Sequence, residues 1–322
     1  MDCIITHGDL DGLASAALLY DVLCRSYGRG KPSLRIAQPF TLHDVLRAVD
    51  LASLEGLYIL DIGVDQGTWS KVRNELTKLS PKALKLWIDH HKATISKVIE
   101  FSELGVSLLY AVEGCTSTIM REAFLNMTSD PEFYAKVALI GEVGDKVREL
   151  KEDDPLFPAV RKLGAALSYR PEDNEFKVSL VKMWVNEKIL INEEVERRAA
   201  EASKRFKELS SMAESKTVFC SEALLILDFR EVEARGFVGK IASDLANKTG
   251  KVVFIAFNSG PYETVVTARA PKDVGTDVSE LLRSIASKVG GSGGGHPKAA
   301  SIRFPSFKYE EVIEGIKRSF KH

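Results

Sequence analysis

Short apolar runs alternate with amphipathic stretches along the first half of the chain. Residues 3–6, 56–60 and 84–88 are apolar runs of strand length, whereas the apolar positions between residues 13 and 23 recur at helical spacing. Alternating strands and helices over this length predict a parallel, doubly wound α/β sheet, in which ligands bind beyond the carboxyl ends of the strands. The polar residues that follow each apolar run are therefore the first candidates for a site.

The pattern changes after residue 174. Residues 174–212 form a long, highly charged helical stretch with glutamate and arginine at i,i+4 spacing, which predicts a solvated connector. Beyond it the apolar pattern predicts further strands and helices, at residues 222–228, 251–256, 264–269, 237–247 and 278–289. We therefore predict an N-terminal α/β domain over residues 1–175, a helical connector over residues 176–214 and a smaller α/β domain over residues 215–322.

Composition narrows the class of protein. With 322 residues, 45% hydrophobic and 28% charged, the chain has the length of two domains and an ordinary soluble composition. No apolar run approaches the roughly 20 residues of a membrane helix, and the N-terminus opens on a strand pattern without a signal peptide. The four cysteines form no CxxC pair, which argues against a thiolate zinc site or a disulfide framework and favours the cytoplasm. Because the net charge is only −1, any attraction for a polyanion must be local.

Potential metal ligands alternate directly after the first predicted strand, in the segment His7-Gly8-Asp9-Leu10-Asp11. Alternate side chains of an extended strand end face the same way, so these three ligands can converge on one point. The competing interpretation is a polar turn in which an aspartate caps the next helix. An EF-hand loop starting at His7 is excluded, because its twelfth position holds Leu18 instead of glutamate.

Acids and histidines also follow the next two predicted strands. Asp61 ends the second strand, and Asp89-His90-His91 ends the third. Adjacent histidines beside an acid have no packing rationale, so a binding site explains this segment better than a structural role does. His43 and His322 look like surface residues, and we assign them no function.

Charge counting favours two metal ions in this constellation. Four aspartates, Asp9, Asp11, Asp61 and Asp145, would be neutralised by two divalent cations, whereas one cation would leave an anionic pocket that repels phosphate. Carboxylates suit hard divalent ions, and a minority of imidazoles shifts the preference toward Mn²⁺, with Mg²⁺ as the alternative. Two cations roughly 3.5–4 Å apart can stabilise both the attack on phosphorus and the departure of the leaving group. The residues therefore predict a two-metal centre that hydrolyses phosphoesters.

The same residues match the motifs of a known family. His7-x-Asp9-x-Asp11-Gly12, Asp61, Asp89-His90-His91 and Asp145 within residues 141–145 resemble, in order, the four N-terminal motifs of the DHH phosphoesterases. The glycine-rich segment at residues 290–297 resembles the motif of that family's C-terminal substrate domain, DHHA1. Five motifs in the right order span nearly the whole chain, which makes the resemblance highly specific.

The resemblance implies a manganese-dependent phosphoesterase with six metal ligands and a bridging Asp61. One ion would take His7 and Asp9 with Asp61, and the other would take Asp11, His90 and Asp145 with Asp61. His91 would face the scissile phosphate, and Asp89 would orient the neighbouring histidine instead of binding metal. Replacing Asp11 or Asp61 is then expected to abolish turnover and to leave the fold largely intact.

Residues 290–295 are open to two interpretations. Six glycine and serine residues in a row are typical of a flexible linker. Their place between a predicted helix and residues 298–303 favours a folded domain, where glycines let backbone N–H groups approach a phosphate closely. The resemblance then implies substrate contacts from Gly293, Gly294, Gly295 and His296. Arg269, at the end of a predicted strand, is the natural bidentate phosphate partner, and with His296 it would neutralise charge in the reaction.

Motif spacing separates the subfamilies. The single residue between His7 and Asp9 resembles archaeal RecJ-like nucleases, and the short chain resembles the helicase-associated 3′→5′ exonucleases. This implies single-stranded DNA or RNA as the substrate, a DNA helicase as a partner and a role in DNA repair. Two alternatives stay open. One is a small-substrate phosphoesterase acting on an oligoribonucleotide, a cyclic dinucleotide or 3′-phosphoadenosine phosphate, and the other is a catalytically inactive replication scaffold.

Overall fold

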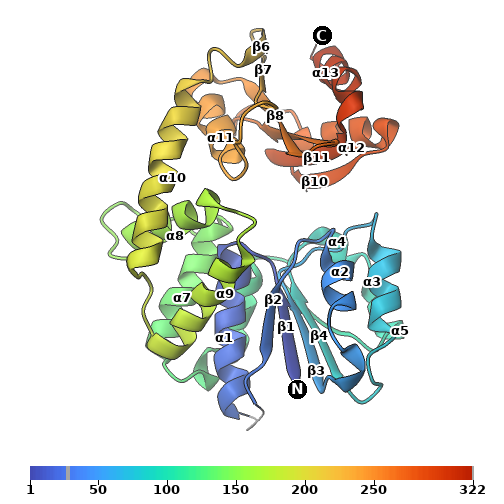
Figure 1. Ribbon diagram of the computed structural model, residues 1–322, viewed down its shortest axis with the longest axis vertical. Coiled ribbons are helices and arrows are strands. Elements are labelled where there is room, and N and C mark those ends of the chain that lie inside the picture. The colour runs from blue at the N-terminus through green and yellow to red at the C-terminus, as the bar shows by residue number, and fades with distance from the viewer. Residues whose placement is uncertain (27–29, 321–322) are drawn as a thin grey trace. The chain divides into compact units, whose positions relative to one another are not determined.

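The computed structural model describes residues 1–26 and 30–320, which form two compact units (Figure 1). Residues 1–167 and 171–199 make up the first unit, and residues 168–170 with the chain from residue 200 onward make up the second. Among the described residues, no helix combines the length and the apolar character that a membrane crossing requires. His322 lies outside the described residues.

A five-stranded sheet forms the centre of the first unit. Its strands are β1 (Asp2–Thr6), β2 (Ser33–Ile36), β3 (Gly56–Leu60), β4 (Leu84–Asp89) and β5 (Ser107–Tyr110). They are all parallel and lie in the order β2-β1-β3-β4-β5. The predicted parallel sheet is therefore confirmed, with β2 and β5 added to the three strands that the apolar runs predict.

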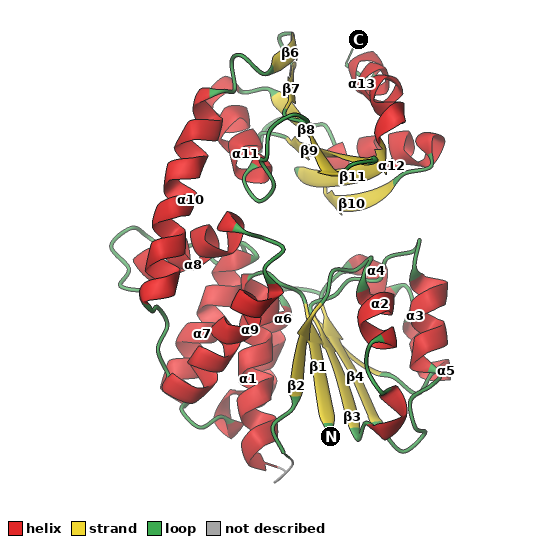
Figure 2. Cartoon of the chain, in the orientation of Figure 1, coloured by secondary structure: helices red, strands yellow, loops and turns green. Residues whose placement is uncertain are grey.

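Helices cover both faces of this sheet, as Figure 2 shows. One core contains residues from α1 (Leu10–Ser26), α6 (Thr116–Phe124), α7 (Pro131–Gly144), α8 (Phe157–Tyr169) and α9 (Asn174–Glu187). The other contains residues from α2 (Leu42–Arg47), α3 (Trp69–Leu76) and α5 (Val98–Glu103). Neighbouring residues of β1 enter different cores, Ile4 the first and Ile5 the second, because successive side chains of a strand point to opposite faces. The doubly wound architecture is thus confirmed. The short helices η1 (Leu51–Ser53), α4 (Lys92–Ile95) and η2 (Leu125–Met127) complete this unit.

His43, which the sequence suggests is a surface residue, is instead only 8% exposed on α2. Its Nε2 lies 3.4 Å from Asp44 Oδ1. Leu42 and Leu46 on the same short helix are also buried. His43 therefore lies on the buried side of this helix together with these apolar residues.

The stretch that the sequence predicts as a connector contains two different helices. α9 contributes Phe176, Leu180 and Trp184 to the first core and therefore belongs to the first unit. The residue that caps its C-terminus, Lys188, adopts a left-handed conformation with φ 56°. α10 (Glu193–Ser211) follows and carries most of the charge. The end of α9 is held by a partly buried ion pair, because Lys188 Nζ lies 3.1 Å from Asp21 Oδ1 on α1.

The second unit is a smaller α/β structure around a mixed sheet. Its strands are β6 (Thr217–Cys220), β7 (Leu224–Asp228), β8 (Val252–Gly260), β9 (Glu263–Arg269), β10 (Ser292–His296) and β11 (Ala299–Pro305). They lie in the order β10-β11-β9-β8-β7-β6, with β7 and β8 parallel and the other described pairs antiparallel. The helices are α11 (Val238–Thr249), α12 (Val278–Val289) and α13 (Tyr309–Arg318), with the short η3 (Ser306–Lys308). The predicted smaller α/β domain is therefore present.

Candidate metal centre

The candidate ligands gather at the carboxyl ends of three adjacent strands. His7 follows β1, Asp61 follows β3, and residues 89–91 lie at the end of β4. Because β1, β3 and β4 are neighbours in a parallel sheet, their ends meet at one edge (Figure 2). The first turn of α1 adds Asp11, and the C-terminal cap of α7 adds Asp145.

One candidate metal group consists of His7, Asp9 and Asp61, whose ligand atoms all lie within 4.8 Å of one another. His7 Nδ1 is 2.8 Å from Asp9 Oδ2 and 3.8 Å from Asp61 Oδ2. The other ring nitrogen, Nε2, lies 3.0 Å from Oε1 of Gln38, which fixes the ring orientation. An imidazole and two carboxylates are a donor set that suits a divalent cation.

A second group consists of Asp61, Asp89, His90 and His91, within the same 4.8 Å limit. Asp61 belongs to both groups and is therefore the residue that two ions could share. His90 Nε2 lies 3.3 Å from Asp61 Oδ1, 3.7 Å from Asp145 Oδ2 and 4.0 Å from Asp11 Oδ2. All the metal ligands that the family resemblance implies are thus brought to one place.

Two of the acids also hold helix ends. Asp9 Oδ1 accepts the backbone N–H of Gly12 at 3.0 Å and caps α1, while its other oxygen faces His7. The competing interpretation of the sequence, an aspartate that caps the next helix, therefore holds for Asp9 alongside its place in the metal group. The carboxylate of Asp11 accepts the N–H groups of Thr116 at 2.9 Å and Ser117 at 2.7 Å, at the start of α6.

The residues that support these acids are not evident from the sequence. Thr116 Oγ1 donates to Asp61 Oδ1 at 3.2 Å, in addition to the backbone contact of Thr116 with Asp11. Ser117 and Gln38 escape prediction for the same reason as Thr116, since serine, threonine and glutamine are too common to stand out among potential site residues. The segment at residues 115–118 has the composition of a helix start, which indicates the helix but not the contact with the acids.

Asp89 and His91 form a fixed pair. Asp89 Oδ1 lies 2.7 Å from His91 Nδ1, and Asp89 Oδ2 accepts a hydrogen bond from Thr94 Oγ1. The threonine hydroxyl in turn accepts the N–H of Val64 at 3.1 Å. A Cβ atom at Gly63 would lie 2.9 Å from Cγ of His91, so a glycine is needed here to leave room for the imidazole. The ring is therefore held from both sides.

The crowding of acids shifts their proton affinities. Burial, followed by the charges of Asp11 and Asp9, raises the pKa of Asp61 well above its usual value. The same three causes raise the pKa of Asp145 to about 7. Burial would lower the pKa of His7, but the charge and hydrogen bond of Asp9 outweigh it and raise the pKa to about 8. A divalent cation that binds these groups must therefore displace protons.

We expect the affinity for Mn²⁺ to increase with pH. Asp145 and His7 bind metal in their deprotonated forms, and with a pKa of about 7 and about 8 they lose their protons as the pH rises. Proton competition then disappears, so the apparent dissociation constant should fall by about tenfold or more between about pH 6 and pH 8. Isothermal titration calorimetry in two buffers of different ionisation enthalpy measures both the affinity and the protons released. An affinity that is the same at both pH values would contradict the assignment of these ligands.

The predicted phosphate contacts lie in the second unit. Arg269 on β9 and His296 on β10 both pair with Ala299, which lies on the strand between them. Arg269 Nη1 donates to the carbonyl of Ala268, whereas its Nε is buried without a hydrogen-bond partner in the described part of the chain. Burial lowers the pKa of Arg269. A half-buried guanidinium with an unused donor at Nε is suited to bind an anion.

The glycine-rich segment forms the edge strand β10, so the flexible-linker interpretation does not hold. Gly293 and Gly295 have φ values of 154° and 141°, which residues with side chains rarely adopt. A Cβ at Gly293 would lie 2.2 Å from the carbonyl oxygen of Ser301, and one at Gly295 would lie 2.4 Å from that of Ala299. In contrast, a Cβ at Gly294 would meet open space. That Gly293, Gly294 and Gly295 contact substrate stays a prediction.

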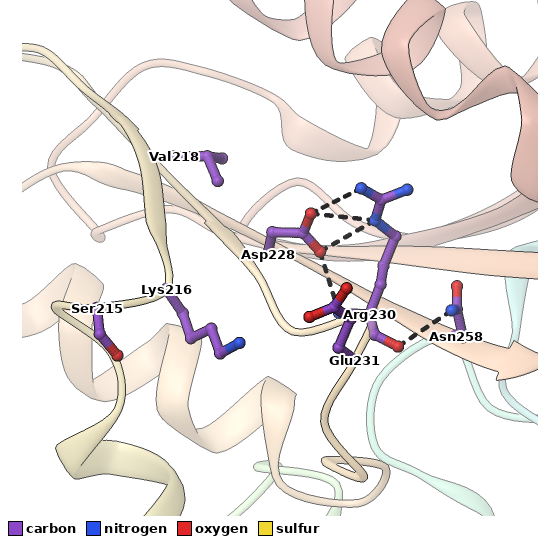
Figure 3. A pocket seen from close by; sticks show the side chains of 7 residues that line it. All are labelled: Ser215, Lys216, Val218, Asp228, Arg230, Glu231 and Asn258. Atoms are coloured by element: carbon purple, nitrogen blue, oxygen red, sulfur yellow. Dashed lines mark hydrogen bonds and ion pairs between the residues drawn. The ribbon is translucent and has the colours of Figure 1, made fainter.

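The second unit also contains a polar depression of about 440 Å³, shown in Figure 3. It is lined by Ser215, Lys216, Val218, Asp228, Arg230, Glu231 and Asn258. Its central charges neutralise each other, since Arg230 Nη2 lies 2.8 Å from Asp228 Oδ2 (Figure 3). Asn258, which lines the depression, lies on β8. On the same strand, Val253 is five residues away and pairs with Arg269 of β9. The depression is therefore separate from the predicted phosphate contacts.

Two family models match the chain over separate regions. The N-terminal domain of the DHH family matches residues 3–141, and the DHHA1 domain matches residues 222–322. The chain combines a DHH domain with a DHHA1 domain. This confirms the family resemblance of the motifs. The DHH match contains every candidate metal ligand except Asp145, which lies four residues beyond it, and the DHHA1 match contains Arg269. None of the curated proteins matches the sequence significantly.

Solved structures share the fold of the whole chain. RecJ from Thermus thermophilus in complex with Mn²⁺ is 16% identical with a TM-score of 0.63, and the match covers 98% of this chain and 51% of RecJ. The DHH domain of a member of the s1p family of ribosomal proteins is 18% identical (TM-score 0.64, 99% and 86% covered). A pGpG-specific phosphodiesterase from Vibrio cholerae is 14% identical (TM-score 0.53, 98% and 97% covered). The chain thus spans about half the length of the Thermus RecJ, and at these identities the likeness shows the fold.

Proposed function

We propose that this protein is a divalent-metal-dependent phosphodiester hydrolase whose reaction takes place at the DHH metal centre. The observation that carries the proposal is that Asp61 belongs to both candidate metal groups, while Asp11 and Asp145 lie 4.0 Å and 3.7 Å from His90 of the second group. Six ligands, His7, Asp9, Asp11, Asp61, His90 and Asp145, would hold two ions, with Mn²⁺ as the expected ion. Bound there, the ions would supply Lewis-acid stabilisation of the phosphoryl oxygens and an activated water.

Protein side chains would complete the chemistry around the phosphate. Asp89 binds Nδ1 of His91, which leaves Nε2 as the ring nitrogen that can face a substrate. Burial lowers the pKa of His91, but the hydrogen bond and charge of Asp89 outweigh it and hold the pKa above its usual value. The ring can therefore carry a proton toward a phosphate oxygen. Arg269 and His296 of the DHHA1 domain would bind and orient the substrate backbone.

The proposed substrate is single-stranded DNA or RNA, trimmed from its 3′ end. The single residue between His7 and Asp9 supports this choice, as does the fold shared with RecJ of Thermus thermophilus. A DNA helicase is the proposed partner, and DNA repair the proposed context. A scaffold role is disfavoured, because a protein without catalysis has no need for four clustered carboxylates whose charges repel one another.

A dinucleotide is the second candidate substrate, and chain length is the observation that favours it. This chain and the Vibrio pGpG phosphodiesterase cover each other almost completely, at 98% and 97%, whereas only half of the Thermus RecJ is covered. In that relative, a chain of about this length is therefore sufficient to act on a small linear nucleotide.

A substrate panel distinguishes the candidates. Single-stranded DNA and RNA labelled at the 5′ or the 3′ end, a linear dinucleotide and 3′-phosphoadenosine phosphate are each incubated with Mn²⁺, and initial rates are compared. The proposal predicts stepwise shortening of 5′-labelled strands from the 3′ end. Turnover of the small substrates alone would overturn the nuclease assignment but keep the hydrolase, and no turnover of any substrate would overturn both.

A further inference from the structure

A lysine is buried directly behind the metal centre. Lys177, in the first turn of α9, is only 3% exposed, although lysine is among the residues least often buried. Its Nζ donates to the carbonyl of Pro171 at 2.6 Å. An ammonium group has three N–H donors, so this bond uses one of them. Burial lowers the pKa of Lys177, and the charges of Asp9, Glu172 and Asp173 offset this only in part. A buried ammonium at this place is therefore costly, which points to a functional reason for it.

The position of Lys177 is tied to Gly8, the residue between His7 and Asp9. A Cβ atom at Gly8 would lie 2.6 Å from Nζ and 3.0 Å from Cδ of Lys177. The lysine head group therefore occupies the space that a side chain at position 8 would need. This places the ammonium against the loop that carries two ligands of one candidate metal group.

The buried cation changes the charge of the loaded centre. Four aspartates and two divalent cations sum to zero, and the ammonium of Lys177 adds one positive charge next to them. A positive charge at this place repels a metal ion and attracts an anionic phosphodiester. The structural arrangement thus supplies local attraction for a polyanion in a chain whose net charge is −1.

We propose that Lys177 sets the charge of the metal centre: its buried ammonium weakens metal binding at His7 and Asp9 and attracts the scissile phosphate. The effect on the substrate rests on the proposed function, whereas the effect on metal affinity does not. A purely structural lysine would act in the opposite direction on the metal, because its loss would loosen the loop and weaken binding.

The test replaces Lys177 by methionine, which is also unbranched, is one heavy atom shorter and carries no charge. We expect Lys177→Met to bind Mn²⁺ about tenfold more tightly in calorimetric titrations, and to show a KM for substrate that is raised about tenfold with little change in kcat. Lys177→Arg keeps the charge and should bind Mn²⁺ like the wild type. Lys182→Met removes an exposed lysine from the same helix and should leave both constants unchanged.

Circular dichroism and thermal unfolding establish that each variant is folded. If the methionine variant does not fold, Lys177→Gln provides the test, since its amide can still donate to Pro171 without a charge. Unchanged or weaker Mn²⁺ binding by the folded, uncharged variant overturns the inference. Tighter Mn²⁺ binding in a protein that cleaves no phosphodiester would instead support the effect on the metal and overturn the proposed function.

Discussion

Replacing Asp61 by asparagine is expected to abolish hydrolysis and, at the same time, to stabilise the metal-free protein. Asp61 belongs to both candidate metal groups, so an amide at this position would weaken the binding of both metal ions. We expect turnover to fall by at least about 10³-fold. Asparagine tolerates the left-handed conformation that Asp61 adopts, with φ 56°, so the backbone should not change.

The gain in stability follows from the raised pKa of Asp61. Burial, then Asp11 and Asp9, hold the pKa of the folded state above that of the unfolded state. The folded protein therefore binds more protons, and its stability is full below the unfolded pKa and is lost as the pH rises through the folded pKa. Above that window the buried charge of Asp61 destabilises the fold, and asparagine removes this charge.

Thermal unfolding in the presence of a chelator at about pH 8 measures the effect. A gain of about 1 kcal/mol would raise the melting temperature by about 2–4 °C in a domain of this size. Asp153→Asn, the same change at an exposed position, serves as the control and should alter neither activity nor melting temperature. Manganese-dependent turnover by Asp61→Asn, or a lower melting temperature than the wild type, would contradict the prediction.

Replacing Asp11 by alanine is expected to abolish hydrolysis and to destabilise the protein. Asp11 is 1% exposed, and its two carboxylate oxygens accept the N–H groups of Thr116 and Ser117. Without the carboxylate, two buried donors at the start of α6 would lose their partners, which should lower the free energy of unfolding by about 2–4 kcal/mol. The sequence suggests an intact fold for this variant, and the capping role of Asp11 changes that expectation.

Urea unfolding of the metal-free protein tests the role of Asp11 in capping. Asp11→Asn keeps one acceptor oxygen and should lie between the wild type and Asp11→Ala in stability, with activity lost in both variants. Equal unfolding midpoints for the wild type and the alanine variant would contradict the capping role. The expected change in stability is thus a gain at Asp61 and a loss at Asp11. The difference arises because only Asp11 of these two accepts the backbone N–H groups at the start of α6.

The predictable parts of this protein are those with a periodic or unusual local sequence. The buried strands before His7, Asp61 and Asp89 are short apolar runs, and adjacent histidines beside an acid are rare enough to mark a site. The sequence does not predict β10 as a strand, because glycine has a low preference for strands and the segment is held by its pairing with β11. Likewise, no local pattern indicates that Thr116 and Ser117, more than a hundred residues after Asp11, donate their N–H groups to its carboxylate.

The left-handed backbone at Asp61 restricts how this protein could evolve. Most replacements at that position would strain the turn after β3, whereas asparagine and glycine fit it, and a single nucleotide change in an aspartate codon gives either one. Both changes would also relieve the repulsion among the buried acids. In a lineage that no longer used the metal centre, replacing Asp61 by an uncharged residue would therefore stabilise the folded protein and would be expected to become fixed. The aspartate in this chain is what natural selection for a working site would maintain.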